Sequence, residues 1–386
     1  MEMLDGVALA PPPCGAFLPA VCYTSPAFYA REMTHVFGAS WQLMADVEAL
    51  AKPGDYVTAV VGDEPIVVVR GDDGILRGFY NVCRHRGMTV AAGSGNCGKR
   101  LTCAYHGWTY DLHGDLIGVP ERPRFGPHFD PSLYALPPIR VETWERFVFV
   151  CLAADTVPLL TYLAPLPEML KPFHLAALVR VVSFTDYLEV NWKTLIDNAI
   201  DDYHVPIVHP TSIHQYIAWG QYRVDTWEHT NCTYTPLTTQ GKRVLRARAD
   251  LPEEAASGIY WAGVFPNLYV NAVPDGSFSW LRVDPLGPNR LRLVTVLYDR
   301  GDLKARFRRR FMRTSAVLIN QEDFKVVRGV TTGIQSRSFT PAPGCGERER
   351  RTQSFQARLM QALAAPMPRP VAASVRCGPD PESGRL

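Results

Sequence analysis

The apolar and polar positions alternate over most of residues 41–155, and this alternation predicts β-strands. DYVTAVVG (55–62) and PIVVVRGDDGILRGFYN (65–81) are rich in β-branched and aromatic residues, and Asp73-Gly74 marks a hairpin turn inside the second segment. Further strands are predicted at 109–118, as another hairpin, and at 141–152, as a single strand. We therefore expect a small antiparallel β domain over residues 41–155.

The chain before this domain is predicted to contain one helix. Ser25 suits an N-cap and Pro26 the first helical position, and the pattern continues to Val36 before Gly38 closes it. We expect residues 1–40 to form an N-terminal segment and a helix that pack on the second domain.

The second half of the chain predicts a sheet combined with a long helix. Strand patterns at 178–190 and 264–299 contain turn signals at Pro274-Asp275-Gly276 and Gly287-Pro288-Asn289. A helical pattern covers 305–330, and an amphipathic one covers 349–364. We expect an α+β protein in which residues 156–364 form a curved antiparallel sheet around a long helix. The Pro-rich residues 365–386 are expected to be a disordered tail.

Composition narrows the class of protein. The chain has 386 residues, 47% of them apolar, and a net charge of +2, so nothing calls for a nucleic-acid or membrane partner. No run is long enough to span a membrane, and no signal peptide pattern begins the chain. The nine cysteines lack the spacing of a disulfide framework, which favours the cytoplasm.

Two short motifs in the first domain combine cysteine with histidine. Cys83 and His85 form a Cys-x-His pair, and Cys103 and His106 form a Cys-x-x-His pair, with seventeen residues between His85 and Cys103. A [2Fe-2S] cluster with two thiolates on one iron and two imidazoles on the other needs one such pair from each of two loops. A structural zinc site is the alternative, although zinc sites usually pair Cys with Cys and His with His.

A second ligand set is predicted in NWKTLIDNAIDDYHVPIVHP (191–210). A helix is expected over 191–202, ended by Pro206 and Pro210. His204 and His209 are five residues apart, which suits a helix end that unwinds so that both imidazoles converge. Two histidines with one carboxylate form the facial triad of non-haem Fe(II) sites, which leaves positions open for O2 and substrate.

The carboxylate is expected from the helix at 305–330. Asp323 lies on an apolar stripe with Ile319 and Val327, and a carboxylate there is costly unless it is paired or binds metal. The alternative is an Asp that faces water. Glu322, with Lys325 three residues on, is predicted to be a solvated residue.

The flanking residues CRHRG (83–87) and CAYHGWTYDLHG (103–114) resemble the Rieske proteins, and more closely the oxygenase branch. Electron-transport members carry an extra cysteine beside each ligand loop, whereas this chain has Gly87, Met88, Ala104 and Tyr105 there. The chain is similar to the catalytic α subunits of Rieske non-haem iron oxygenases of the ring-hydroxylating type. In that family the catalytic domain has a helix-grip-like fold and the subunits usually form trimers.

The resemblance implies a role for each candidate residue. The cluster would be held by Cys83, His85, Cys103 and His106, and the mononuclear Fe(II) by His204, His209 and Asp323. Asp201 would be the catalytic residue that bridges His204 to the His106 of the next subunit, with Asp202 as the alternative. Trp108 is expected either to shield the cluster from water or simply to pack.

The implied activity needs O2 and electrons from NAD(P)H. No nucleotide-binding motif is credible here, so a separate reductase is implied, either alone or with a ferredoxin. It would dock on Arg84, Arg86, Lys99 and Arg100 unless these belong to a solvated loop.

Residues 54–87 and FPNLYVN (265–271) look most like choline and betaine monooxygenases. This implies mono-oxygenation of a small organic substrate, by hydroxylation or by N- or O-demethylation. A quaternary ammonium substrate would need an aromatic cage, for which the candidates, otherwise core residues, are Phe265, Tyr269, Phe278 and Trp280. Aromatic ring cis-dihydroxylation is the alternative. A protein of another class, a Rieske electron carrier or a zinc-binding protein without oxygenase activity, would not need His204, His209 and Asp323.

Overall fold

A computed structural model describes residues 2–13, 15–301 and 305–372 of the chain. The described residues form two compact units. The larger unit combines the described residues up to Leu43, Thr143–Arg146 and those of Val157–Met367, and the smaller unit combines Met44–Glu142, Phe147–Thr156 and residues 368–372. Within the described residues, no helix has both the length and the apolar character that crossing a membrane requires.

The smaller unit is built on β-sheets, as the alternating pattern predicts. Its larger sheet has seven strands in the order β3-β12-β11-β6-β5-β4-β7, and its smaller sheet has the order β10-β9-β8. The strands are β3 (Gln42–Asp46), β4 (Asp55–Val61), β5 (Glu64–Arg70), β6 (Leu76–Tyr80), β7 (Ser94–Asn96), β8 (Arg100–Thr102), β9 (Thr109–Asp111), β10 (Leu116–Gly118), β11 (Pro138–Trp144) and β12 (Phe147–Cys151). The predicted hairpins β5/β6 and β9/β10 are confirmed.

One strand prediction in this region is wrong. Residues 141–152 were expected to form a single strand, but they span the end of β11 and all of β12. The chain reverses at Glu145 and Arg146, and Glu145 has the left-handed backbone angle φ 53° that such a tight turn uses. Two adjacent charged residues between apolar runs were the only sequence sign of this turn.

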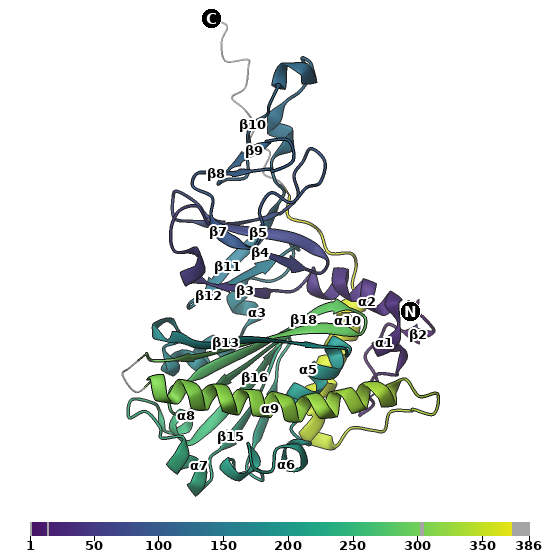
Figure 1. Cartoon of the computed structure of the whole chain (residues 1–386). Helices are drawn as coiled ribbons and strands as arrows, with labels where there is room; N and C mark the ends of the chain where they lie inside the picture. Colours follow the sequence, from purple (N-terminus) through teal and green to yellow (C-terminus); the bar gives the residue numbers. More distant parts are fainter. Residues whose placement is uncertain (1, 14, 302–304, 373–386) are drawn as a thin grey trace, which may run out of the picture. The chain divides into compact units, whose positions relative to one another are not determined.

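The larger unit contains a second seven-stranded sheet, antiparallel throughout, in the order β13-β19-β18-β17-β16-β15-β14. The sheet is curved, and α9 (Ala305–Ile334) lies across one face of it (Figure 1). The strands are β13 (Val179–Leu188), β14 (Arg223–Thr226), β15 (Thr230–Pro236), β16 (Gly258–Val264), β17 (Leu268–Ala272), β18 (Phe278–Gly287) and β19 (Arg290–Asp299). Both predicted turns, at 274–276 and 287–289, separate consecutive strands of this sheet.

Helices from both ends of the chain pack beside this sheet. One apolar core joins α2, α5, α9 and α10 through Phe28, Trp192, Phe324 and Phe355. Ser25 caps α2 as predicted, because its Oγ accepts hydrogen bonds from the N–H groups of Ala27 and Phe28. The helices are α1 (Val21–Thr24), α2 (Pro26–Glu32) with a π-helical continuation (Met33–Phe37), α3 (Leu159–Tyr162), α4 (Leu166–Leu170), α5 (Trp192–Ile200), α6 (Val205–Val208), α7 (Thr239–Val244), α8 (Glu253–Ser257) and α10 (Arg350–Ala364).

The predicted tail, residues 365–386, lies only partly within the described residues. Arg369 and Pro370 run beside Ala153 and Ala154: the N–H of Ala154 donates to the carbonyl of Arg369 over 2.8 Å, and Ala153 pairs with Pro370 in an antiparallel bridge. Residues 373–386 lie outside the described part of the chain.

The helix expected at 191–202 ends earlier than predicted. Helix α5 stops at Ile200, and Pro206 lies in the first turn of the next helix, α6, instead of ending the first. Proline suits a first turn because the N–H that it lacks would have no helical partner there. The chain therefore has an extended corner between the two helices, at Asp201.

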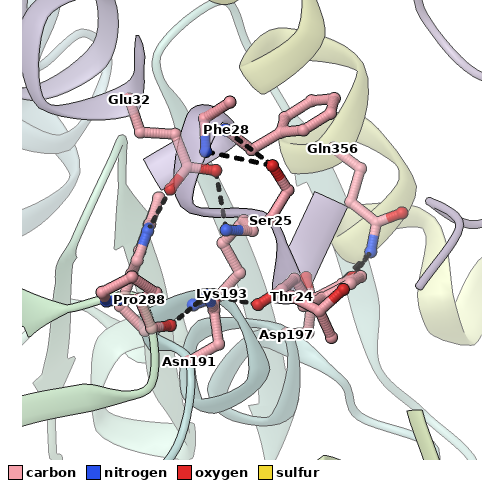
Figure 2. A network of polar contacts seen from close by, with 12 residues as sticks. Thr24, Ser25, Phe28, Glu32, Asn191, Lys193, Asp197, Pro288 and Gln356 are labelled. Carbon is pink, nitrogen blue, oxygen red and sulfur yellow. Dashed lines mark hydrogen bonds and ion pairs between the residues drawn. The ribbon is translucent and has the colours of Figure 1, made fainter. Parts of the chain in front are cut away.

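Buried polar side chains anchor helix α5 (Figure 2). Nζ of Lys193 lies 2.6 Å from Oε1 of Glu32 on α2, with both side chains almost fully buried. The indole N–H of Trp192 donates to the other oxygen of Glu32 over 2.7 Å. One turn further on, Oδ2 of Asp197 accepts hydrogen bonds from the Tyr23 hydroxyl at 2.6 Å and the Gln356 amide at 3.1 Å. Burial raises the pKa of Asp197 to about 6.

Candidate metal centres

Two loops of the smaller unit present the Cys/His pairs in matching conformations. The N–H of Cys83 donates to the carbonyl of Met88, and the N–H of Cys103 donates to the carbonyl of Trp108, each over 2.8 Å. Each cysteine carbonyl in turn accepts from a glycine four residues on, Gly87 or Gly107, over 3.0 Å. Both glycines have positive φ angles, 79° and 71°, which explains why glycine follows each pair.

The two loops bring their four predicted ligands together. The rings of His85 and His106 lie 4.6 Å apart, centroid to centroid. Cys83 and Cys103 are buried, and burial, with the Cys103 thiol beside it, raises the pKa of Cys83. Nδ1 of His85 is buried without a hydrogen-bond partner, which is costly unless the nitrogen binds something. Two thiols and two imidazoles from two matched loops fit a [2Fe-2S] cluster of the Rieske type.

Aromatic residues enclose one side of the histidine pair. Trp108 is buried and stacks on the ring of His85 with centroids 4.9 Å apart and planes 8° apart. The tryptophan therefore both packs and covers a ligand ring, so the two expectations for it do not exclude each other. A hollow of about 430 Å³ opens beside these residues, and it is lined by His85, His106, Trp108, Pro120, Glu121, Arg124 and Phe125.

In the larger unit, His204, His209 and Asp323 meet as the facial-triad hypothesis requires. Oδ1 of Asp323 lies 3.0 Å from Nε2 of His209 and 3.5 Å from Nε2 of His204. Their potential ligand atoms all lie within 4.8 Å of one another. The separation of five residues works because His204 precedes the single turn of α6 and His209 follows it. Asp323 comes from α9.

The electrostatics of this group favour a bound cation. Burial disfavours a charged His204, but hydrogen bonds with Asp201 and Asp323 outweigh it and raise its pKa to about 9. Burial likewise opposes the ionised form of Asp323, yet the two histidines hold its pKa near 2. A divalent metal would compete with protons for these nitrogens and for the carboxylate.

Each of the three residues has a further partner that fixes its orientation. Oδ2 of Asp201 lies 3.3 Å from Nδ1 of His204, and the Asn198 amide donates to Oδ1 of Asp323 over 2.8 Å. Oε2 of Glu322 lies 2.7 Å from Nδ1 of His209. Because carboxylates occupy both Nδ1 atoms, both Nε2 atoms remain available for a metal.

The interpretation of Glu322 as a solvated residue is wrong. Its side chain is only 19% exposed and points to His209, which lies 113 positions earlier in the chain. Lys325, three residues on, suggested a surface pair, and no local pattern indicated a distant histidine. An acidic residue directly beside a candidate ligand was the one available signal.

The structure separates the two adjacent aspartates at 201 and 202. Asp201 contacts His204 and keeps 21% of its side chain exposed. Asp202 turns toward the sheet, where it accepts a hydrogen bond from Thr233 and lies 3.5 Å from the fully buried guanidinium of Arg351. Asp201 is therefore the carboxylate that could reach both His204 and another molecule.

The four aromatic residues named as cage candidates all have packing partners inside the fold. Phe265 packs against Phe355, and Phe278 against Tyr298. The Trp280 indole donates to the Tyr298 hydroxyl over 3.2 Å, and Tyr269 lies under the guanidinium of Arg351. These contacts agree with the core alternative for the four.

Two family models match the chain. Residues 40–144 match the Rieske [2Fe-2S] domain, and residues 175–365 match the ring hydroxylating alpha subunit (catalytic domain). Together they cover both ligand sets, so the chain has a Rieske cluster and a mononuclear iron as cofactors.

Similar proteins include oxygenase subunits and a solved structure. The carnitine monooxygenase oxygenase subunit of Acinetobacter pittii is 35% identical over 335 residues, covering 83% of this chain and 86% of that protein. The glycine betaine monooxygenase oxygenase subunit of Chromohalobacter salexigens is 34% identical over 203 residues, 52% of this chain and 45% of that protein. The crystal structure of the quaternary ammonium Rieske monooxygenase CntA with L-carnitine has a TM-score of 0.77 and 25% identity, covering 90% of this chain and 95% of that one.

Proposed function

The chain belongs to the catalytic α subunits of the Rieske non-haem iron oxygenases, and from this premise we propose that its substrate is a small quaternary ammonium compound that it mono-oxygenates. The observation that carries the proposal of an oxygenase site is the convergence of His204, His209 and Asp323 within 4.8 Å. The relatives that act on carnitine and glycine betaine support the substrate class. We place the protein in the cytoplasm, as the scattered cysteines suggested.

The smaller unit would hold the cluster and the larger unit the mononuclear iron, and each would have a different task. When bound, the cluster supplies electrons singly, and the ferrous ion supplies open positions at which O2 and substrate are brought together. Cys83, His85, Cys103 and His106 would hold the first, and His204, His209 and Asp323 the second. Asn198, Asp201 and Glu322 orient the iron-binding side chains through the hydrogen bonds described above. The buried position of His209 keeps bulk water from one side of the site.

A substrate screen tests this function. The iron-loaded protein is mixed with NADH and a generic reductase, and O2 uptake and product mass are measured with carnitine, glycine betaine and an uncharged arene. We expect substrate-dependent uptake with a quaternary ammonium compound and a product that has gained one oxygen or lost a methyl group. A cis-diol from the arene alone would favour ring dihydroxylation. A purified protein that contains zinc and no iron would rule out an oxygenase.

We further propose that the working form is a head-to-tail trimer in which the cluster of one subunit serves the iron of the next. The support is the partly exposed His106 beside its hollow and the partly exposed carboxylate of Asp201 at His204. Asp201 would accept hydrogen bonds from both histidines and so join the two centres. The reductase would dock on the basic residues Arg84, Arg86, Lys99 and Arg100, all of which are exposed.

Complementation between two inactive variants tests this route. His106→Ala removes a cluster ligand, and His204→Ala removes an iron ligand, so each variant alone should be inactive. If electrons cross between subunits, co-expression of the two should restore about a quarter of the wild-type rate, because about one site in four then has an intact donor and an intact acceptor. Differently tagged wild-type chains, captured through both tags, show that mixed oligomers form. Mixed oligomers without activity would mean that electrons stay within one chain.

A further inference from the structure

The imidazole of His209 is held between two neighbouring carboxylates of helix α9. Glu322 lies 2.7 Å from its Nδ1, and Asp323 lies 3.0 Å from its Nε2. The His209 side chain is only 2% exposed, so bulk water has little access to its ring nitrogens. Consecutive residues of one helix therefore fix both ends of one ring, and the ring cannot rotate without losing a charged partner.

Ser212 holds Glu322 in place at Nδ1 of His209. Its hydroxyl donates to Oε2 of Glu322 over 2.5 Å, the same oxygen that receives Nδ1–H of His209. The backbone turns after His209, because its carbonyl accepts hydrogen bonds from the N–H groups of Ile213 and His214, at 3.2 and 2.9 Å. This turn returns Ser212 to the side of His209. Glu322 thus has two partners from the segment that carries the metal-binding histidine, although 110 or more positions separate them in sequence.

The other predicted iron ligand, His204, is held less tightly than His209. Its Nδ1 lies 3.3 Å from Asp201, and its Nε2 lies 3.5 Å from Asp323, both longer than the corresponding contacts of His209. Asp201 is also only three residues from His204, so this contact moves with the segment and does not tie it to α9. Glu322 therefore ties His209 to α9, whereas Asp201 does not tie His204 to that helix.

We propose that Glu322, supported by Ser212, is the positioning residue that keeps the mononuclear metal bound, while Asp201 contributes little to metal affinity and remains available to a second partner. An ionised Glu322 accepts Nδ1–H, which fixes the tautomer of His209 with the Nε2 lone pair facing Asp323. Its negative charge also strengthens the imidazole as a ligand. This inference rests on the proposed iron site, but it does not depend on the substrate or on the trimer.

Metal titration of the cluster-loaded protein tests the proposal. A chelator removes the mononuclear ion, and the dissociation constant for added Fe(II) is measured anaerobically by equilibrium dialysis. We expect Glu322→Ala to weaken binding ten- to a hundredfold. Glu322→Gln should lose less, because an amide oxygen still accepts Nδ1–H. Asp201→Asn should change the constant less than about threefold, because its bond to His204 is longer. Gln321→Ala, at an exposed position of the same helix, is the matched control.

The outcomes separate a positioning role from a merely structural one. If Glu322→Ala lowers the melting temperature but binds Fe(II) as tightly as Gln321→Ala, the proposal is wrong. It is also wrong if Asp201→Asn weakens binding more than Glu322→Ala does. Should the alanine variant not fold, Glu322→Gln and Ser212→Ala keep the comparison possible, and both must weaken binding. A wild-type protein that binds no Fe(II) would instead contradict the proposed oxygenase function.

Discussion

His204→Ala is expected to leave the cluster in place while the mononuclear iron and nearly all turnover are lost. The substitution removes one of the three side chains that converge at the predicted iron site. In the unsubstituted protein, Nε2 of His204 lies only 3.5 Å from Asp323. We expect iron to fall from about three to about two atoms per chain, because only the cluster irons remain. Loss of roughly 4 kcal/mol of stabilisation by the metal would slow substrate-dependent O2 uptake about a thousandfold.

The measurements are iron per chain, visible absorption of the cluster, and O2 uptake with substrate. His214→Ala is a suitable control, because this histidine lies in the same segment but is not part of the metal-binding group. It should retain about three irons and wild-type uptake. An unchanged cluster spectrum combined with unchanged turnover in His204→Ala would show that the oxygenase site is elsewhere or absent.

Lys193→Met should destabilise the larger unit by about 3–5 kcal/mol, because it leaves the carboxylate of Glu32 buried without its cation. In the folded protein these side chains are 1% and 0% exposed, and the charged atoms lie 2.6 Å apart. The Trp192 indole alone cannot compensate a full negative charge. The midpoint of denaturant unfolding, followed by tryptophan fluorescence, measures the loss.

Two further variants identify the cause. The double variant Glu32→Gln with Lys193→Met should recover part of the lost stability, because no uncompensated charge remains. Lys171→Met breaks an exposed pair with Glu168, whose side chains are 71% and 80% exposed, and should cost at most about 0.5 kcal/mol. A loss below about 1 kcal/mol in Lys193→Met would mean that water or a rearranged partner satisfies Glu32.

Local patterns predicted the parts of the fold that depend on neighbouring residues. The hairpin at Asp73-Gly74 follows from a turn that needs a positive φ, and Gly74 has φ 79°. The two ligand sets could be predicted because Cys-x-His, Cys-x-x-His and the pair His204 and His209 are each short motifs, and the structure brings the residues of each set together. Asp323 could be predicted only because a carboxylate on an apolar stripe needs a partner.

The features that sequence did not predict all involve distant partners. Glu322 is adjacent to a predicted ligand, but its contact with His209 spans 113 positions. The resemblance favoured Asp201 over its neighbour Asp202, but only the fold shows that Asp202 pairs with Arg351. Lys193 and Arg351 are charged residues with 1% and 0% exposure, which no pattern of apolar positions indicates. Such residues require the assembled fold.

The position of α10 has a consequence for biosynthesis. Arg351 contacts Asp202 and Gln356 contacts Asp197, so residues of α10 support the corner that leads to His204. A ribosome delivers this helix after every proposed metal ligand, whereas the four proposed cluster ligands all lie before residue 107. The predicted iron site therefore lacks its support from Arg351 and Gln356 until α10 has been synthesised, long after the predicted cluster ligands.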